Sequence, residues 1–287
     1  RGASYDIYMM NSDGTGSPTR LTGGMAGVWN TSPTWSPDSG KIAFDSNVSG
    51  SYQVHVMNAD GTGDRSLTET SQNYAPAWSS DGAKITYTSY RDGNFEIYVM
   101  GSDGSNQTRL TSDASFENTN PAWAPDGSKV AYSGYHGTTG QKIYLMNPDG
   151  SGKYRLVEAP EGQWYPSWSQ DGSKLSLSKY MGEDLSIYTV DADGSNLTSI
   201  TTSGMYQGAA WRSVGPPETP EPTPVPPTAT PEPTSTPTPV PPTATPEPTL
   251  TPIPAPEPEL GSLFWDFENQ EDLGLSLIHI CRCRRAI

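Results

Sequence analysis

The sequence has 287 residues, a formal net charge of −15 and two cysteines. An acidic chain lacks the basic patches that attract nucleic acids and anionic membrane surfaces, which argues against both as partners. No apolar stretch approaches the ~20 residues of a membrane-spanning helix. The first 280 residues contain no Cys, which is compatible with an exported bacterial protein.

Residues 1–213 contain an internal repeat that is marked by tryptophans at spacings of 43 to 45 residues. Each of the first four tryptophans, in stretches such as SPTWS and APAWS, precedes a turn and a short strand such as KIAF or KITY. A second alternating strand (QVHVMN, EIYVMG), an Asp-Gly turn and a last strand (RSLT, TRLT) complete each unit. The five tryptophans are Trp35, Trp78, Trp123, Trp168 and Trp211.

The alternation, the β-branched and aromatic residues and the Asp-Gly turns predict four-stranded antiparallel sheets, and no segment has a sustained helical period. One such sheet cannot bury both of its faces alone, so successive sheets are expected to pack as blades around an axis. The sequence therefore predicts an all-β propeller with four complete blades and partial ones. In this fold the repeated tryptophans pack blade against blade.

The succession of APAWS, SDGAKITY, EIYVMG and TRLT resembles the WD-like (PD-type) propeller repeat of the TolB family. The same repeat occurs in the propellers of prolyl oligopeptidase-type proteins, and the resemblance covers residues 1–213. It implies a β-propeller, and TolB-like rings commonly have six blades. The resemblance is weak for function, because one fold serves many proteins.

The start of the chain, RGASYDIY, aligns with RDGNFEIY at residues 91–98, so the first residues are expected just before the third strand of a blade. Trp211 would open a blade without a second strand behind it. We therefore expect an N-terminally truncated propeller that lacks upstream blades. The alternative is a five-blade ring, closed by pairing of the N-terminal strands with the Trp211 strand.

The remaining residues divide into three segments. Residues 214–260 are rich in Pro, Thr and Glu, contain PTPVPPTATPEPT twice, and predict an extended polyproline II stalk to a second exported module. The alternative is a proline-rich ligand for a cytosolic groove domain. Residues 261–274 resemble the start of a jelly-roll or laminin-G-like β-domain. Residues 275–287, with LSLIHICRCRR, resemble a translated sequencing adapter and are excluded from fold reasoning.

Candidate binding residues lie in loops that the strand order of a blade places on one face. Loops between the second and third strands share this face with the loops that join successive blades, and they vary in sequence. Aromatic rings beside amide side chains suit peptide or sugar recognition by the face as a whole, although capping of the core at a blade end is the favoured role for any single residue. The candidates are Trp29, Asn30, Tyr74, Arg91, Asn118, Asn120, His136, Trp164, Tyr165, Tyr206 and Gln207.

The Asp-Gly turns are expected on the opposite face. Carboxylates at this spacing could ligate Ca²⁺, but no turn completes a calcium loop with a distant bidentate Glu. Asp-Gly is also what a tight turn requires, because Gly adopts positive φ freely. We therefore predict turns, with no metal and no cofactor.

The sequence predicts no enzyme, although the fragmentary chain leaves a catalytic role open. It contains three histidines and no Gly-x-Ser-x-Gly motif, and no hydrolase domain follows the propeller. We predict a monomeric, extracytoplasmic platform that binds a protein, a peptide or a glycan without inserting into a membrane. The alternatives are a TolB-like envelope component, engaging a peptidoglycan-associated partner, and the propeller of a hydrolase or lyase.

Overall fold

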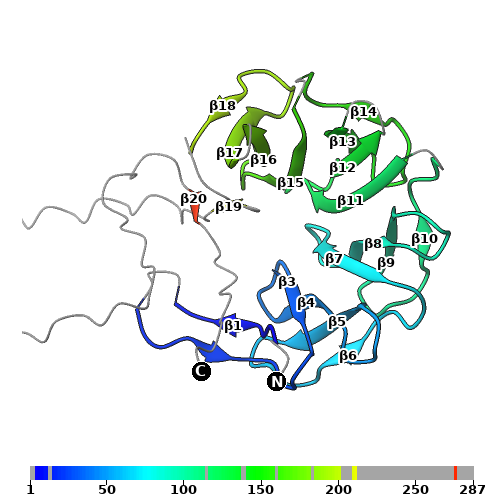
Figure 1. The fold of residues 1–287 in the computed structure, drawn as a ribbon, viewed down its shortest axis with the longest axis vertical. Helices are drawn as coiled ribbons and strands as arrows, with labels where there is room; N and C mark the ends of the chain where they lie inside the picture. Colours follow the sequence, from blue (N-terminus) through cyan, green and yellow to red (C-terminus); the bar gives the residue numbers. More distant parts are fainter. Residues whose placement is uncertain are drawn as a thin grey trace, which may run out of the picture. The chain divides into compact units, whose positions relative to one another are not determined.

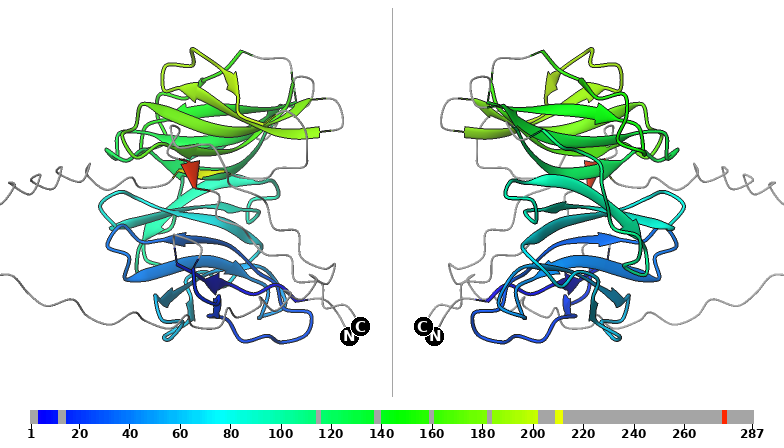
Figure 2. Two further views of the ribbon diagram at one scale, coloured as in Figure 1. Left: turned by 90° about the vertical axis from the view of Figure 1, so that its left-hand side faces the viewer. Right: turned by 90° about the vertical axis from the view of Figure 1, so that its right-hand side faces the viewer.

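The computed structural model describes residues 4–11, 15–113, 116–136, 140–158, 161–181, 184–201, 209–211 and 275–276. The described residues form β-strands and turns without a helix, and four antiparallel sheets of four strands each follow one another along the chain (Figure 1). Side views show the sheets stacked on one another (Figure 2). The predicted β-propeller fold is therefore confirmed.

The four complete blades have the strand order expected of meanders, with each strand paired to the next along the chain. Blade 1 contains β3 (Asn30–Trp35), β4 (Lys41–Ser46), β5 (Gln53–Asn58) and β6 (Arg65–Ser66). Blade 2 contains β7 (Asn73–Trp78), β8 (Lys84–Ser89), β9 (Glu96–Gly101) and β10 (Thr108–Arg109). Blade 3 contains β11 (Phe116–Trp123), β12 (Val130–His136), β13 (Gly140–Met146) and β14 (Tyr154–Arg155). Blade 4 contains β15 (Gln163–Trp168), β16 (Lys174–Met181), β17 (Asp184–Asp191) and β18 (Thr198–Ser199).

Two strand pairs flank these blades. β1 (Tyr8–Met9) pairs with β2 (Thr19–Arg20) ahead of blade 1, at the positions of a third and a fourth strand. β19 (Ala210–Trp211) follows blade 4 and pairs with β20 (Leu275–Ser276). The predicted stalk at 214–260 and the predicted second domain at 261–274 lie outside the described residues. So does the adapter-like segment, apart from its first two residues.

The hydrophobic core lies between successive blades. Val54 and Val56 of blade 1 share one buried cluster with Ile85 and Tyr87 of blade 2. The middle strands β4, β5, β8 and β9 are buried nearly throughout, because a neighbouring blade covers each face of their sheet. A single blade would expose these apolar side chains to water, so stacking drives folding.

Four of the repeated tryptophans contact the preceding blade, namely Trp78, Trp123, Trp168 and Trp211, whereas Trp35 is 41 % exposed. Trp78 is buried in the cluster that blades 1 and 2 share. The indole Nε1 of Trp168 donates to the carbonyl oxygen of Ala122 at 3.2 Å, and that of Trp211 donates to Ser167 at 3.0 Å. Each of these bonds joins a tryptophan to the inner strand of the blade before it.

Each inner strand also contains a register shift, with one residue at positive φ just before a proline. In blades 2 to 4, the second strand of the preceding blade supplies an oxygen to the backbone amide of that residue. In blade 2 Ala75 (φ 47°) donates to Asp45 Oδ1 at 2.9 Å. In blade 3 Asn120 (φ 54°) donates to Thr88 Oγ1 at 3.1 Å. The backbone amide at positive φ requires an acceptor from the preceding blade, which explains why these positions of the second strands are polar.

The third-to-fourth-strand turns add a close contact between blades. A Cβ atom on Gly150 (φ 83°) would lie 2.6 Å from the carbonyl oxygen of Leu110 in the preceding blade. Only glycine satisfies both the positive φ and this approach.

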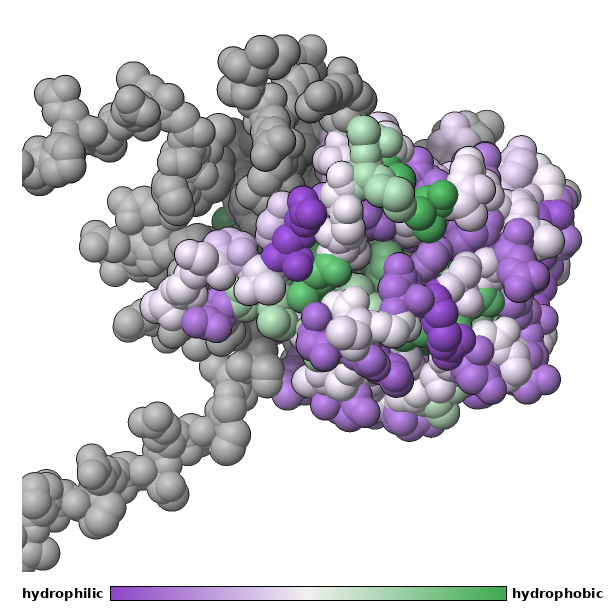
Figure 3. Space-filling view, turned by 90° about the horizontal axis from the view of Figure 1, so that it is seen from below, coloured by the Kyte–Doolittle hydropathy of each residue, from purple (hydrophilic) through white to green (hydrophobic). Residues whose placement is uncertain are grey.

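The outer surface of the blades is mainly polar. Seen from below, hydrophilic residues cover most of the visible described surface, and hydrophobic residues form scattered patches (Figure 3). Within the described part of the chain, no helix is long and apolar enough to cross a membrane.

Candidate functional site

The two ends of the strands define two different surfaces. We call the loop face the surface formed by the loops between second and third strands and by the loops that join blades. We call the turn face the surface formed by the short turns between first and second strands and between third and fourth strands.

Several large aromatic side chains are exposed on the loop face. Trp29, Tyr90, Tyr135 and Tyr180 are 38 to 41 % exposed, and each lies at or next to a strand end. Trp29 contacts Tyr5 edge-on, with ring centroids 5.1 Å apart. A hydrophobic ring held at such exposure is available for stacking against a ligand.

Aromatic contacts on this face also run from blade to blade. Tyr52 of blade 1 lies 4.8 Å from Tyr74 of blade 2, and Tyr74 lies 6.0 Å from Phe95. Phe95 in turn lies 4.9 Å from Tyr90. In blade 4, the rings of Trp164 and Tyr180 meet at 4.8 Å. Tyr74 and Trp164 are among the predicted site residues.

Two of the predicted amides are buried in contacts between blades. Asn118 Nδ2 donates to Glu96 Oε2 at 2.9 Å, and Asn30 Nδ2 donates to Asp6 Oδ1 at 3.3 Å and to the Tyr5 carbonyl at 3.2 Å. Asn30 is 6 % exposed and Asn118 is 4 % exposed. Their side chains are therefore used inside the protein.

Other predicted residues also have internal contacts. The Arg91 guanidinium lies 4.4 Å from the Tyr98 ring centroid and donates to Tyr87 Oη and Gln107 Oε1, both at 2.8 Å. Asn120 and Tyr165 occupy the positive-φ positions of their inner strands. The backbone of His136 ends β12, but its side chain lies outside the described residues, as do Tyr206 and Gln207.

The loop face contains a buried carboxylate that the sequence analysis missed. Asp45 is 1 % exposed, and it accepts hydrogen bonds from the Ala75 amide and from the Thr31 hydroxyl. Burial raises the pKa of Asp45 above its usual range. The pKa of Tyr74 is raised by burial and by the charge of Asp45. The sequence contained a signal for Asp45: it is a carboxylate at a position where the later blades have Thr88, Ser133 and Ser178.

On the turn face the aspartates organise their own turns. Asp81 Oδ1 accepts from Ser79 Oγ at 2.6 Å and from the Ala83 amide at 3.0 Å. These bonds hold the pKa of Asp81 below its usual range. Asp171, which accepts from the Ser169 hydroxyl and from Ser173, has its pKa lowered to about 2. Among the described residues, no group of three or more His, Cys, Asp or Glu side chains could hold a metal ion.

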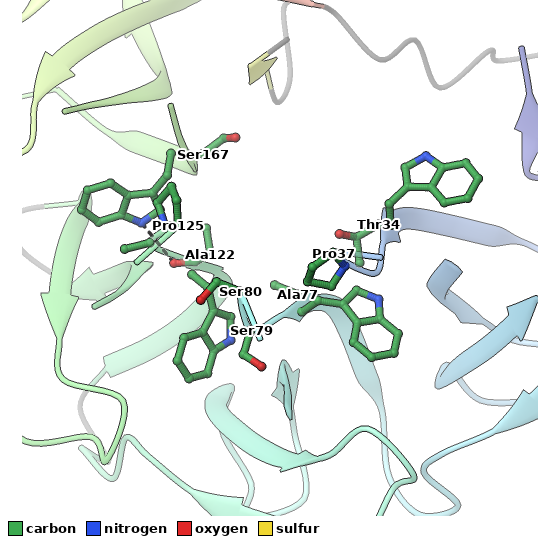
Figure 4. A pocket seen from close by; sticks show the side chains of 13 residues that line it. Thr34, Pro37, Ala77, Ser79, Ser80, Ala122, Pro125 and Ser167 are labelled. Atoms are coloured by element: carbon green, nitrogen blue, oxygen red, sulfur yellow. Dashed lines mark hydrogen bonds between the residues drawn. The ribbon is translucent and has the colours of Figure 1, made fainter. Parts of the chain in front are cut away.

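A depression lies on the turn face, between the ends of the inner strands. The sequence analysis placed no site there. Its volume is about 250 Å³, and it lies between residues of four neighbouring blades (Figure 4). Thr34, Ala77, Ala122 and Ser167 occupy equivalent positions around it, each directly before a repeated tryptophan. The repeated sequence does not show whether such small side chains leave a space, because the space depends on how the blades are arranged around it.

Comparisons with known proteins agree with this architecture. The TolB beta propeller domain family matches residues 65–215, whereas curated protein sequences give no match. The structure of putative TolB from Agrobacterium tumefaciens is 23 % identical with a TM-score of 0.61, over 72 % of this chain and 85 % of that chain. TolB from Acinetobacter baumannii is 22 % identical with a TM-score of 0.63, over 72 % of this chain and 51 % of that chain.

A more distant similarity extends to an enzyme. A puromycin-hydrolyzing peptidase from Mycobacterium tuberculosis is 15 % identical with a TM-score of 0.55, and the match covers 72 % of this chain but 37 % of the peptidase. The present chain thus spans about half of the A. baumannii TolB and a smaller part of the peptidase. These structural likenesses concern the fold, whereas the family match covers more than half of the sequence. The chain belongs to the TolB β-propeller family.

Proposed function

We propose that this protein is a binding platform whose loop face takes a protein, peptide or carbohydrate ligand. The observation that carries the proposal is the set of exposed aromatic rings at the ends of neighbouring blades: Trp29, Tyr90, Tyr135 and Tyr180. Flat, rigid rings contribute a large contact area at a low cost in conformational entropy, and they stack on sugar rings and on peptide side chains alike.

Hydrogen bonds and ring contacts join neighbouring blades at parts of this face. Loop-face ends are joined by buried hydrogen bonds such as that from Asn118 to Glu96, and the Tyr52–Tyr74–Phe95–Tyr90 contacts span two blades. A ligand that binds such a preorganised surface loses less affinity to the ordering of loops. This supports ligand recognition by the loop face as a whole. Asn30 and Asn118 stabilise that face through hydrogen bonds inside the protein.

We further propose an extracytoplasmic location for a monomeric propeller held on a proline-rich stalk. The membership in the TolB propeller family and the absence of Cys from the first 280 residues support this location. The duplicated PTPVPPTATPEPT segment supports the stalk, because such a sequence favours extended polyproline II.

A TolB-like role in the cell envelope is the second candidate, and the family match favours it. In this case the ligand would be a protein of the envelope rather than a glycan. The propeller of a hydrolase or lyase is the third candidate, and the match to the peptidase propeller supports it.

The test is to offer the full chain to a glycan array and to immobilised peptides derived from bacterial envelope proteins. The hits are then measured with W29A/Y180A, which removes two exposed rings from the loop face. We expect roughly thirtyfold weaker binding of the variant, because each of the two stacked rings contributes on the order of 1 kcal/mol.

Tyr154→Ala is the matched control, because Tyr154 is 45 % exposed but lies on the outer strand β14. Binding of this control should equal that of the wild type. If W29A/Y180A binds every hit as tightly as the wild type does, the loop face is not the binding surface. If the wild type retains only glycans, the TolB-like role with an envelope protein as ligand is contradicted, and if it retains only peptides, a carbohydrate ligand is contradicted.

A further inference from the structure

One exposed aromatic side chain recurs at the same position of three successive blades. Tyr90, Tyr135 and Tyr180 follow one another at intervals of 45 residues, and each lies at or directly after the loop-face end of a second strand. Their exposed fractions are nearly equal, at 40 %, 40 % and 38 %. Blades 2, 3 and 4 therefore present the same group to solvent at the same position.

Blade 1 presents its exposed ring from the neighbouring position on the first strand. Asn47 stands where the later blades have tyrosine, and its side-chain oxygen accepts from the backbone amide of Trp29 at 2.7 Å. The Asn47 amide donates to the Trp29 carbonyl, as the Tyr90 amide donates to that of Gln72 in blade 2. Every complete blade thus carries one exposed ring at this edge. We call these four rings the aromatic row: Trp29, Tyr90, Tyr135 and Tyr180.

The packing of the blades sets the interval within the aromatic row. Buried clusters join blade 1 to blade 2, blade 2 to blade 3 and blade 3 to blade 4, so successive sheets pack face to face. Sheets that pack in this way lie about 10 Å apart, and Tyr90, Tyr135 and Tyr180 recur at intervals of this order. A ligand that contacts all of them is therefore an extended chain.

Neighbouring rings orient members of the row without covering them. Tyr90 meets Phe95 at an interplanar angle of 59°, and Tyr180 meets Trp164 at 85°. Neither contact is a parallel stack, which would cover a whole ring face. The rings thus keep area for stacking against a ligand.

The positions of the row and those beside them on the first strands are nearly uncharged. They are occupied by Trp29, Asn47, Gln72, Tyr90, Glu117, Tyr135, Gly162 and Tyr180. Among these positions of the described chain, Glu117 is the one that carries a charge. A ligand along the row therefore needs no charge of its own.

Charged side chains next to the row in sequence are occupied within the protein. Arg91 donates to Tyr87 Oη and to Gln107 Oε1, both at 2.8 Å. Lys179 Nζ lies 3.0 Å from Glu161 Oε2. These cations already have partners, so they give the row little attraction for an anionic ligand.

We propose that the aromatic row binds an uncharged polysaccharide that extends over several blades, with sugar faces stacked on its four rings. This inference rests on the proposed function, because it names the class of ligand for the same loop face. A polysaccharide repeats one unit and so offers the same face to each ring, whereas a peptide would need the same side chain at every interval. A sugar has an apolar face and a rim of hydroxyls, which suit the face and the hydroxyl of tyrosine and the amides of Asn47 and Gln72.

The first test is affinity electrophoresis of the full chain in native gels that contain hydroxyethylcellulose, laminarin or galactomannan. We expect at least one of these neutral polysaccharides to retard the protein. Added salt should leave the retardation unchanged, because salt screens charges and this contact uses none. Oligosaccharides of the retarding polymer then compete, and longer ones should compete better than the disaccharide because the disaccharide reaches fewer rings.

Single variants test whether the rings act as a row. Tyr90→Ala, Tyr135→Ala and Tyr180→Ala should each bind the retarding polysaccharide roughly fivefold more weakly, since each removes one equivalent stacking contact. Tyr135→Phe keeps the ring and should lose less than Tyr135→Ala. Tyr154→Ala, on the outer strand β14, should bind as the wild type does. Equal thermal unfolding midpoints of all variants exclude misfolding as the cause of a loss.

The outcomes separate this inference from the proposed function. Retention of envelope peptides, with no neutral glycan bound on the gels or on the array, overturns the polysaccharide and leaves the binding platform standing. Binding of neither class contradicts both. A loss confined to one of the three alanine variants, or a disaccharide that competes as well as longer chains, assigns the glycan to a local pocket and overturns the row.

Discussion

At the scale of single residues, one position of each second strand must supply a hydrogen-bond acceptor to the positive-φ amide of the next blade. Thr88 and Ser133 supply a hydroxyl to that amide in the later blades, whereas blade 1 uses the carboxylate of Asp45. A buried carboxylate loses much of its hydration, so its charged form is disfavoured. Asp45 is thus an electrostatic exception within an otherwise repeated contact.

Replacement of this carboxylate gives the first prediction. Since folding raises the pKa of Asp45, the wild type loses stability as pH rises from its unfolded-state pKa through its folded-state pKa. Asp45→Thr, which copies Thr88, lacks this dependence and should gain on the order of 1 kcal/mol relative to the wild type at neutral pH.

Urea unfolding of both proteins between about pH 4 and pH 7 measures the effect. Thr88→Ser is the control, because it keeps a hydroxyl without introducing a charge. If the difference in free energy of unfolding between D45T and the wild type is constant over this range, burial does not disfavour the charged form of Asp45.

At the scale of strands and blades, a hydrogen-bond group recurs in blades 1 and 2, where it joins the third strand to the next blade. In blade 1, Gln53 Oε1 accepts from Thr68 Oγ1 at 2.7 Å and from Asn73 Nδ2 of blade 2 at 2.9 Å. In blade 2 the same group consists of Glu96, Thr111 and Asn118. Such groups satisfy buried polar atoms at the place where two sheets meet.

Blade 3 departs from this arrangement. Lys142 and Val157 occupy the first two positions, and Gln163 Nε2 of blade 4 is buried without a hydrogen-bond partner among the described residues. Lys142 is 2 % exposed and donates to the Glu161 carbonyl at 2.9 Å. Burial lowers the pKa of Lys142, and the charge of Arg155 lowers it further.

The second prediction restores the group in blade 3. K142Q/V157T places Gln and Thr as in blade 1, and Gln163 Nε2 then has an acceptor. We expect a gain of about 1–2 kcal/mol in the free energy of unfolding at neutral pH, because an unsatisfied donor and a buried charge are both removed.

The gain should shrink as pH rises through the lowered pKa of Lys142, where the wild-type lysine loses its charge. Chemical unfolding at neutral and alkaline pH measures both effects. The single variant Val157→Thr is the control, and a double variant no more stable than this control would contradict the prediction.

At the scale of the whole molecule, stability in acid should follow the aspartate turns. Folding lowers the pKa values of Asp38, Asp60, Asp81, Asp103 and their counterparts in later blades, chiefly through hydrogen bonds from neighbouring Ser or Thr residues. Their contribution is present above the usual Asp pKa and is lost as pH falls through the folded-state values.

The third prediction is therefore a fall in the thermal unfolding midpoint as pH decreases from about 4 to about 2. A variant with Asn at Asp38, Asp81, Asp126 and Asp171 keeps the side-chain acceptor of each turn and should show a shallower fall. Calorimetry over this range measures the slope, and equal slopes for the two proteins would contradict the assignment.

Much of the fold was determined by the sequence itself. Alternating apolar strands, Asp-Gly turns and tryptophans at a regular spacing are local patterns, and they were sufficient to predict four-stranded blades and a propeller. The turn role of Asp81 and its counterparts was readable for the same reason, since their hydrogen-bond partners lie two residues away. Trp29 was identified as a loop residue by its place before an inner strand, and it is exposed.

The tertiary structure alone decided which polar side chains are available to a ligand. Asn30 and Asn118 have the loop positions of binding residues, but their partners Asp6 and Glu96 lie more than 20 residues away on the preceding sheet. The buried charge of Asp45 and the depression beside Trp35 depend likewise on the neighbouring blades. Contacts between sheets are non-local, so a pattern within one repeat predicts the strand on which a side chain lies but not what covers it.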